Sequence, residues 1–215
     1  MFSVFNSFND HSSNLFALSM PLIPSSEHKM IVVSAPSGAG KTTIVKHLLD
    51  TFPQLGFSVS ATSRKMREGE KDGREYYFMS SEEFRQKIAE GKLLEWQEVY
   101  PGSYYGTQVS EVERITMNGQ FPVFDVDVVG GLNIKKMYGE KALAIFIRPP
   151  SYEILESRLR SRASDSEESL QKRLNKVKWE LTFEKEFDRI IVNDRLEDSL
   201  RESENLVKDF LGIKS

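Results

Sequence analysis

The sequence contains no cysteine, only three histidines and no long hydrophobic run. Without cysteine the chain forms no disulfide, no thiolate metal site and no cysteine nucleophile, which agrees with a location in the reducing cytoplasm. So few histidines argue against a zinc site. The longest apolar stretches, such as "ALAIFI" at 142–147, are the size of a strand and far shorter than the roughly 18 to 20 residues of a bilayer span. We therefore expect a cytoplasmic protein with no membrane partner.

The N-terminal segment lacks the basic residues of a targeting signal. It is rich in serine, asparagine and phenylalanine, and its first lysine or arginine is Lys29. A secretory signal begins with basic residues and a transit peptide carries arginines, so neither is predicted. We expect residues 1–29 to be an extension outside the folded domain, or translation to begin at Met20 or Met30.

Composition and charge indicate one ordinary globular domain. The 215 residues are 39% hydrophobic and 28% charged, which allows a sizeable core. The net charge of −3 argues against a surface that coats nucleic acid, so any anion site must be local. We expect no nucleic-acid partner and either a monomer or a small homo-oligomer.

From residue 30 onward, apolar strands alternate with amphipathic helices. Strands are predicted at "MIVVSA" (30–35), "GFSVSATS" (56–63), "QFPVFDVDVV" (120–129), "KALAIFIRPP" (141–150) and "RIIVND" (189–194). Helices are predicted from Lys41 to about residue 52, from Ser80 to Gly91, after a Ser110 cap, and over most of 151–187 and 197–212. Residues 64–75 are predicted as loop and 101–109 as turn. The alternation predicts an α/β fold, a parallel sheet with helices on both faces.

A glycine-rich stretch, "SAPSGAGKTTI" at 34–44, stands between the first strand and the first helix. Such a loop points backbone N–H groups at one place near the positive end of the helix, which suits a phosphate. Ala35 stands where the common pattern has glycine, but Gly38 and Gly40 are the positions that most need no side chain. The alternative is a tight turn with an incidental lysine. We predict an ATP site made by Ala35, Pro36, Ser37, Gly38, Ala39, Gly40, Lys41, Thr42 and Thr43.

Two carboxylates end the apolar strand at 120–129. Residues two apart on a strand project to the same face, so Asp125 and Asp127 are expected to point at one site, at the sheet edge where open α/β sheets bind ligands. Oxygen ligands suit Mg²⁺, and we predict Asp125 and the Thr42 hydroxyl as its ligands. The alternative is that one aspartate only caps the turn near Gly130.

A phosphate loop alone is compatible with a GTPase, an ATP-driven motor or a small-molecule kinase. The segment from Ser60 to Tyr76 gathers hydroxyls and cations, among them Arg64 and Arg67. Arginine forks and phenol groups suit a second phosphate, that of an acceptor. Alternatively, each charge is a solvated surface group paired with a neighbour such as Glu70.

A single carboxylate, Glu95, lies before a further glycine turn that carries Tyr105 and Thr107. A carboxylate accepts two parallel hydrogen bonds, which the N1–H and N2 amino edge of guanine donates and adenine does not. The alternative for Glu95 is a surface acid at a helix end.

Three arginines occur in the helical region that follows 151. Arg158 and Arg162 lie one helical turn apart, and Arg173 follows a serine-rich break. Arginines on a closing segment stabilise charge on a transferring phosphate and exclude water. The alternative is a salt-bridged surface helix, because Glu153 and Glu156 lie nearby.

In order and spacing, these motifs resemble those of guanylate kinases across residues 30–215. The motifs are "SAPSGAGKTT", "FSVSATSRKMREGEKDGREYYF", "LEWQEVYPGSYYGT", "FDVDVVGG" and "SRLRSRASDSEESLQKRL". The resemblance implies Mg²⁺-dependent transfer of the ATP γ-phosphate to GMP, and to dGMP. It implies a P-loop core at 30–62, 109–150 and 176–215, a mixed GMP-binding subdomain at 63–108 and a helical lid at 151–175.

The resemblance also implies roles for individual residues. The GMP phosphate is held by Arg64, Arg67, Tyr76 and Tyr105. Guanine is read by Ser60, Glu95, Thr107 and Asp127. Lys41 with the lid residues Arg158, Arg162 and Arg173 acts on the transferring phosphate, and Asn193 lies near the adenine of ATP.

The chain departs from the family pattern in four places, none of which removes a group that the reaction needs. These are Ala35, "SRAS" in the lid, "RKMR" without its usual proline, and "YPGSYYG", which is one residue longer. Two other functions stay open. One is a non-catalytic guanylate-kinase-like interaction module, which typically has a degraded phosphate loop, and the other is a kinase for a different phosphorylated acceptor.

Overall fold

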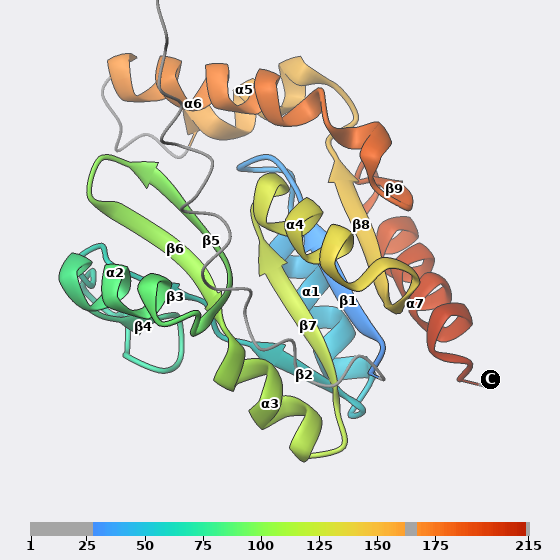
Figure 1. Ribbon diagram of the computed structural model, residues 1–215. Coiled ribbons are helices and arrows are strands. Elements are labelled where there is room, and N and C mark those ends of the chain that lie inside the picture. Colours follow the sequence, from blue (N-terminus) through green and yellow to red (C-terminus); the bar gives the residue numbers. More distant parts are fainter. Residues whose placement is uncertain (1–27, 162–166, 214–215) are drawn as a thin grey trace, which may run out of the picture.

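The computed structural model of the chain describes residues 28–161 and 167–213. Most of the predicted N-terminal extension and the lid residue Arg162 lie outside these ranges. Figure 1 shows a larger sheet covered by helices, a smaller sheet beside it, and two helices, α5 and α6, that cross one end of the molecule.

The larger sheet has five strands in the order β2-β7-β1-β8-β9, and every neighbouring pair is parallel. This confirms the predicted parallel sheet. The strands are β1 (Met30–Ser34), β2 (Leu55–Ser58), β7 (Phe121–Val126), β8 (Ala142–Arg148) and β9 (Arg189–Val192). Because all five run the same way, the loops that follow β1 and β7 meet at one edge of the sheet.

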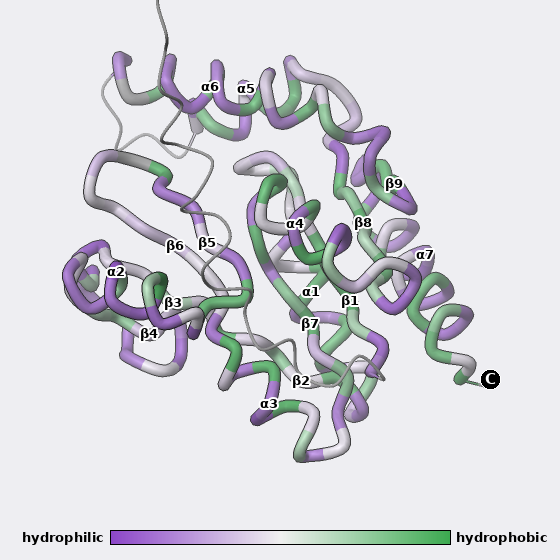
Figure 2. The backbone as a smooth tube through the Cα atoms, viewed as in Figure 1, coloured by the Kyte–Doolittle hydropathy of each residue, from purple (hydrophilic) through white to green (hydrophobic). Residues whose placement is uncertain are grey.

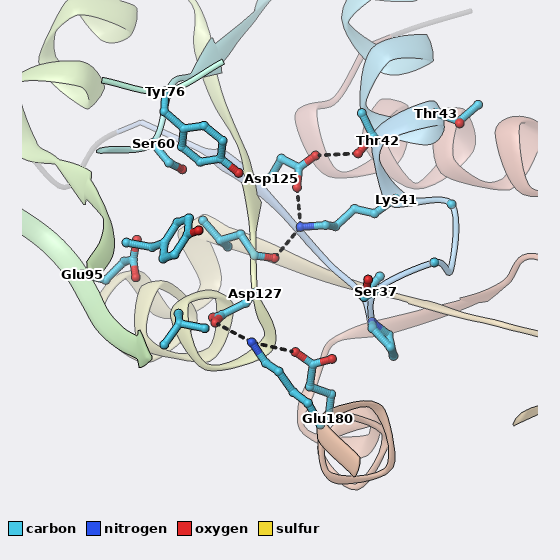
Figure 3. A pocket seen from close by; sticks show the side chains of 18 residues that line it. Ser37, Lys41, Thr42, Thr43, Ser60, Tyr76, Glu95, Asp125, Asp127 and Glu180 are labelled. Atoms are coloured by element: carbon cyan, nitrogen blue, oxygen red, sulfur yellow. Dashed lines mark hydrogen bonds and ion pairs between the residues drawn. The ribbon is translucent and has the colours of Figure 1, made fainter. Parts of the chain in front are cut away.

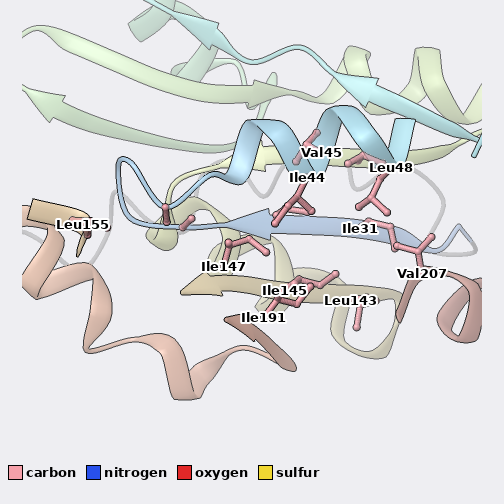
Figure 4. Close-up of a cluster of buried hydrophobic side chains, with 14 of the residues drawn as sticks. Ile31, Ile44, Val45, Leu48, Leu143, Ile145, Ile147, Leu155, Ile191 and Val207 are labelled. Carbon is pink, nitrogen blue, oxygen red and sulfur yellow. The ribbon is translucent and has the colours of Figure 1, made fainter. Parts of the chain in front are cut away.

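Helices cover both faces of this sheet, so its central strands are apolar along their length. Ile31 and Val33 face the cluster that α1 and α7 cover, and Figure 4 shows Ile31 in this cluster with Ile44 and Leu48 of α1. Met30 and Val32 face the cluster beneath α4. Figure 2 shows the same contrast, with apolar β1, β7 and β8 inside and more polar outer helices. The helices are α1 (Lys41–Thr51), α3 (Val109–Met117), α4 (Val128–Tyr138), α5 (Tyr152–Ser161), α6 (Glu167–Leu181) and α7 (Leu196–Leu211), with 3-10 turns at Gly139–Lys141 and Glu184–Glu186.

The smaller sheet is mixed, with the order β4-β3-β6-β5. Its strands are β3 (Ala61–Thr62), β4 (Tyr77–Phe78), β5 (Leu93–Tyr100) and β6 (Ser103–Gln108). Helix α2 (Ser81–Ala89) packs on it through Phe84, whose ring stacks on Tyr104 at 5.4 Å. A capping box formed by Ser80 and Glu83 starts α2 where a serine cap was predicted.

Several local predictions were wrong. The strand predicted at 56–63 is two strands in two sheets, because the chain leaves the larger sheet after Ser58 and pairs Ala61 with Gly106. The turn predicted at 101–109 is mostly strand β6, which pairs with β5. Helix α3 begins at Val109 and has Gln108 at its N-cap, so Ser110 does not cap it. The lid boundary at 175 stays a prediction, and it falls within α6, which continues to Leu181.

Within the described ranges, no helix combines the length and the apolar character that crossing a membrane requires.

Candidate active site

A cavity of about 520 Å³ opens at the carboxyl ends of β1 and β7 (Figure 3). The larger sheet, the smaller sheet and α6 all contribute side chains to it. Most of the predicted site residues line it, namely Ala35, Pro36, Ser37, Gly38, Gly40, Lys41, Thr42, Thr43, Ser60, Tyr76, Glu95, Tyr105, Asp125 and Asp127. The sequence therefore predicted which segments converge here.

The loop between β1 and α1 depends on two glycines. Gly38 and Gly40 have φ angles of 90° and 95°, a region that residues with a side chain rarely adopt. Ala35 is buried in the apolar cluster and does not have a positive φ, so alanine fits there without strain. The side-chain amide of Asn193 donates to the carbonyl of Ala39 at 2.8 Å and fixes the loop from the end of β9.

Lys41, the first residue of α1, forms an ion pair with Asp125 of β7 and donates to the carbonyl of Val126 at 2.7 Å. The register of the sheet produces this contact. Val33, the next-to-last residue of β1, pairs with Asp125, so the carboxylate lies near the helix that follows β1. The hydroxyl of Thr42 lies 3.4 Å from the other oxygen of Asp125. A hydroxyl and a carboxylate are the hard oxygen donors that Mg²⁺ prefers, so these two side chains fit the predicted metal site.

Asp127 reaches the same cavity by a different route from the one predicted. Strand β7 ends at Val126, and Asp127 is the N-cap of α4, with one carboxylate oxygen accepting from the Gly130 N–H at 2.9 Å. The argument that two residues of one strand share a face was therefore wrong for Asp127. Asp127 lines the cavity, and its alternative role as a cap near Gly130 is confirmed.

Glu95 is a buried strand residue, so its interpretation as a surface acid at a helix end is wrong. It lies on β5 with 8% of its surface exposed, and one of its oxygens accepts from the Thr107 hydroxyl at 2.7 Å across the β5–β6 pair. The other oxygen lies against Gly130 in the first turn of α4. Burial, more than any other cause, raises the pKa of Glu95 to about 7, and the negative charge of Asp127 adds to the effect.

The two predicted acceptor arginines lie beside the cavity and do not line it. The Arg64 guanidinium pairs with both oxygens of Glu70, at 2.6 and 2.7 Å, and stands over the Tyr76 ring at 5.0 Å. This pairing raises the pKa of Arg64 and lowers the pKa of Glu70 to about 2. Arg67 is exposed, and its backbone N–H donates to Glu70 at 2.7 Å.

The predicted lid residues are only partly brought to the site. Arg173 on α6 donates to the Ser37 hydroxyl of the phosphate loop at 3.1 Å. Arg158 lies on α5, half-buried and outside the cavity wall, and Arg162 lies outside the described residues. Asn193 is buried against the loop, and its predicted contact with adenine stays a prediction.

The sequence prediction missed four residues of the cavity wall. These are Val99, Val126, Lys176 and Glu180. A signal for two of them was present, because Arg173, Lys176 and Glu180 are spaced i, i+3 and i+7 and so share one helical face. The wall therefore contains a lysine and a buried carboxylate that the motifs do not include.

The family model for guanylate kinases matches residues 27–210. The chain belongs to the guanylate kinase family. The guanylate kinase of Bacteroides fragilis is 50% identical over 187 residues, which cover 87% of this chain and 92% of that protein. The guanylate kinase of Chlorobium chlorochromatii is 46% identical over 184 residues, or 86% of this chain and 96% of that protein.

A solved structure agrees with the family assignment. The crystal structure of guanylate kinase from Anaplasma phagocytophilum aligns with a TM-score of 0.69 and 30% identity over 90% of each chain. The predicted P-loop kinase fold of the guanylate kinase family and the predicted enzyme class are thereby confirmed.

The Gly40→Ala substitution tests the tightness of the phosphate loop. A Cβ atom at Gly40 would lie 2.3 Å from the Asn193 amide nitrogen, and the backbone has φ 95°. We expect the free energy of unfolding, measured by urea denaturation, to fall by about 2 kcal/mol or more. The control Gly119→Ala also has a positive φ, 70°, but meets open space, so it should lose only about 1 kcal/mol. Equal losses in the two variants would contradict the packing of Asn193 on the loop.

Proposed function

We propose that the chain catalyses the Mg²⁺-dependent transfer of the ATP γ-phosphate to GMP, and to dGMP, with ADP and GDP or dGDP as products. One observation carries the proposal. A single cavity holds a phosphate loop on one side and a buried, guanine-compatible carboxylate, Glu95, on the other. The names of the related guanylate kinases support the same reaction.

The donor site is proposed at the phosphate loop. The N-terminal turn of α1 points its N–H groups at the loop, which favours phosphate oxygens. The Lys41 ammonium, now paired with Asp125, is close enough to turn toward the β- and γ-phosphates when ATP enters. Thr42 and Asp125 would hold Mg²⁺, which when bound offsets negative charge on the phosphates. Arg173 approaches the same loop at Ser37 and adds positive charge.

The acceptor base is proposed at Glu95. Thr107 holds one of its oxygens, so the carboxylate has a fixed orientation. Guanine donates two hydrogen bonds from N1–H and the N2 amino group, and an ionised carboxylate accepts both. Adenine lacks this pair of donors, so the same site discriminates against AMP.

The acceptor phosphate is proposed near Tyr76 and Tyr105, whose rings meet edge-on at 5.8 Å in the cavity wall. Arg64 stands beside them, paired with Glu70. A GMP phosphate would replace Glu70 as the partner of Arg64, because a dianion attracts the guanidinium more strongly than a carboxylate does.

The chemical step needs positioning and charge neutralisation more than covalent help. An oxygen of the GMP phosphate attacks the γ-phosphorus of ATP as the bond from that phosphorus to the β–γ bridging oxygen breaks, and ADP leaves with the bond electrons. Lys41 and Arg173 stabilise charge on the transferring group. This requirement agrees with a sequence that contains no cysteine nucleophile.

The two other functions are less well supported. An interaction module has no need of the phosphate loop, whereas here Lys41, Thr42 and Asp125 contact one another in the cavity. A kinase for a phosphorylated acceptor that lacks guanine would have no base to bind at the buried carboxylate of Glu95. The cytoplasmic location and the oligomeric state stay predictions.

A coupled assay of ADP formation tests the proposed reaction. We expect turnover with ATP and GMP, and little turnover with AMP or UMP. The Glu95→Gln variant should lower kcat/KM for GMP about tenfold or more, because its amide cannot accept both guanine donors and one bidentate pair is worth roughly 1 to 3 kcal/mol. An inactive wild-type protein with GMP, alongside activity with AMP or UMP, would overturn the proposal. An unchanged rate in Glu95→Gln would remove Glu95 from guanine binding.

The pH dependence of the KM for GMP tests the ionisation of Glu95. Its pKa is raised to about 7, so the carboxylate is protonated below that pH and meets the guanine donors with a proton of its own. Between about pH 7.5 and about pH 6 its ionised fraction falls roughly eightfold, and the KM for GMP should rise by up to that factor. GMP itself titrates in this range, so Glu95→Gln is the control. In this variant the KM for GMP should rise much less as the pH falls. An equal rise in the wild-type protein and the variant would contradict the role of Glu95 ionisation.

A further inference from the structure

Two charged side chains of α6 line the cavity, although neither residue belongs to the family motifs in the sequence. Lys176 and Glu180 lie one helical turn apart, on the face that also carries Arg173. Arg173 contacts Ser37 on the phosphate loop, whereas Lys176 points toward Asp127 at the start of α4. The helix therefore contacts both the donor loop and a residue predicted to read the acceptor base.

Asp127 divides its two carboxylate oxygens between the fold and the cavity. One oxygen caps α4 by accepting from the Gly130 N–H. The other lies 3.9 Å from the Lys176 ammonium, and the Gln97 amide, oriented to donate, lies 2.5 Å from it. Gln97 belongs to β5 of the smaller sheet. Three separate segments thus fix the position of the Asp127 carboxylate.

Glu180 is placed where a negative charge is unfavourable. Only 3% of its surface is exposed, and it lines a cavity that is otherwise suited to phosphates. Its ion-pair partner is Lys176, at 3.6 Å, and the same ammonium lies 3.9 Å from the Asp127 carboxylate. Burial raises the pKa of Glu180 to about 7, with Lys176 and Lys41 acting in the opposite direction and Asp127 in the same one. The ion pair with Lys176 gives this buried carboxylate a role, which is to hold the lysine ammonium in place.

We propose that Lys176 is a positioning residue for the acceptor nucleotide. Its ammonium, anchored by Glu180, holds the cavity-facing oxygen of Asp127 in the orientation that receives guanine. This inference rests on the proposed function, because that function places guanine at Asp127. Lys176 acts through Asp127 and takes no part in the transfer of the phosphate.

The Lys176→Met variant tests the proposal by separating the two substrates. Methionine keeps most of the side-chain length and removes the charge. We expect the KM for GMP to rise about threefold to tenfold, with kcat and the KM for ATP within about twofold of the wild-type values. Lys176→Arg should restore the KM for GMP. The matched control is Lys172→Met, one turn earlier on α6, where the lysine is exposed and pairs with the exposed Glu168, and it should change none of these constants.

A double variant protects the test from a folding defect. Lys176→Met leaves Glu180 without its partner, whereas Lys176→Met with Glu180→Gln removes both charges and should show the same rise in the KM for GMP. If the wild-type protein phosphorylates GMP and both variants keep the wild-type KM for GMP, this inference is overturned and the proposed function is not. An equal rise in the KM for ATP would also overturn it, since that result indicates a general structural role. A wild-type protein inactive with GMP would overturn the proposed function first.

Discussion

The ion pair between Lys41 and Asp125 is the interaction on which the rest of the site depends. It joins the first turn of α1 to the end of β7, two segments 84 positions apart that only a parallel sheet with this register brings together. The same strand end leads directly into Asp127 and the first turn of α4, against which Glu95 packs from the smaller sheet. The glycine-rich loop and the buried carboxylate of Glu95 are therefore both positioned by the carboxyl end of one strand, β7.

The site includes charges that do not favour folding. Glu95 and Glu180 are both buried, and burial raises the pKa of each to about 7. Since each folded-state pKa lies above the ordinary value, the folded chain binds more protons than the unfolded chain. Each group therefore lowers stability as the pH rises from about 4.5 through 7. Carboxylates retained under such conditions are typical of functional sites, where stability is given up for binding.

Local motifs and strand ends could be predicted from the sequence, whereas pairings between distant segments could not. The phosphate loop and Asp125 were predictable because the loop directly follows one apolar strand and Asp125 lies near the end of another. Strand β3 has two residues and exists only through its pairing with β4 and β6, so no periodicity marks it. The burial of Glu95 depends on the same sheet. Likewise, Glu70 as the partner of Arg64, and the contact of Lys176 with Asp127, follow from the folded loop and helix positions.

The central claim is that a buried carboxylate recognises the two-donor edge of guanine. Its most direct test is to measure, by calorimetry and without ATP, the dissociation constants of the wild-type protein for GMP and for inosine 5′-monophosphate. The inosine nucleotide keeps N1–H and lacks the N2 amino group. If Glu95 accepts both donors, GMP should bind roughly tenfold more tightly or better, because one hydrogen bond to a buried charged group is lost with inosine. Equal dissociation constants for the two nucleotides would contradict the claim.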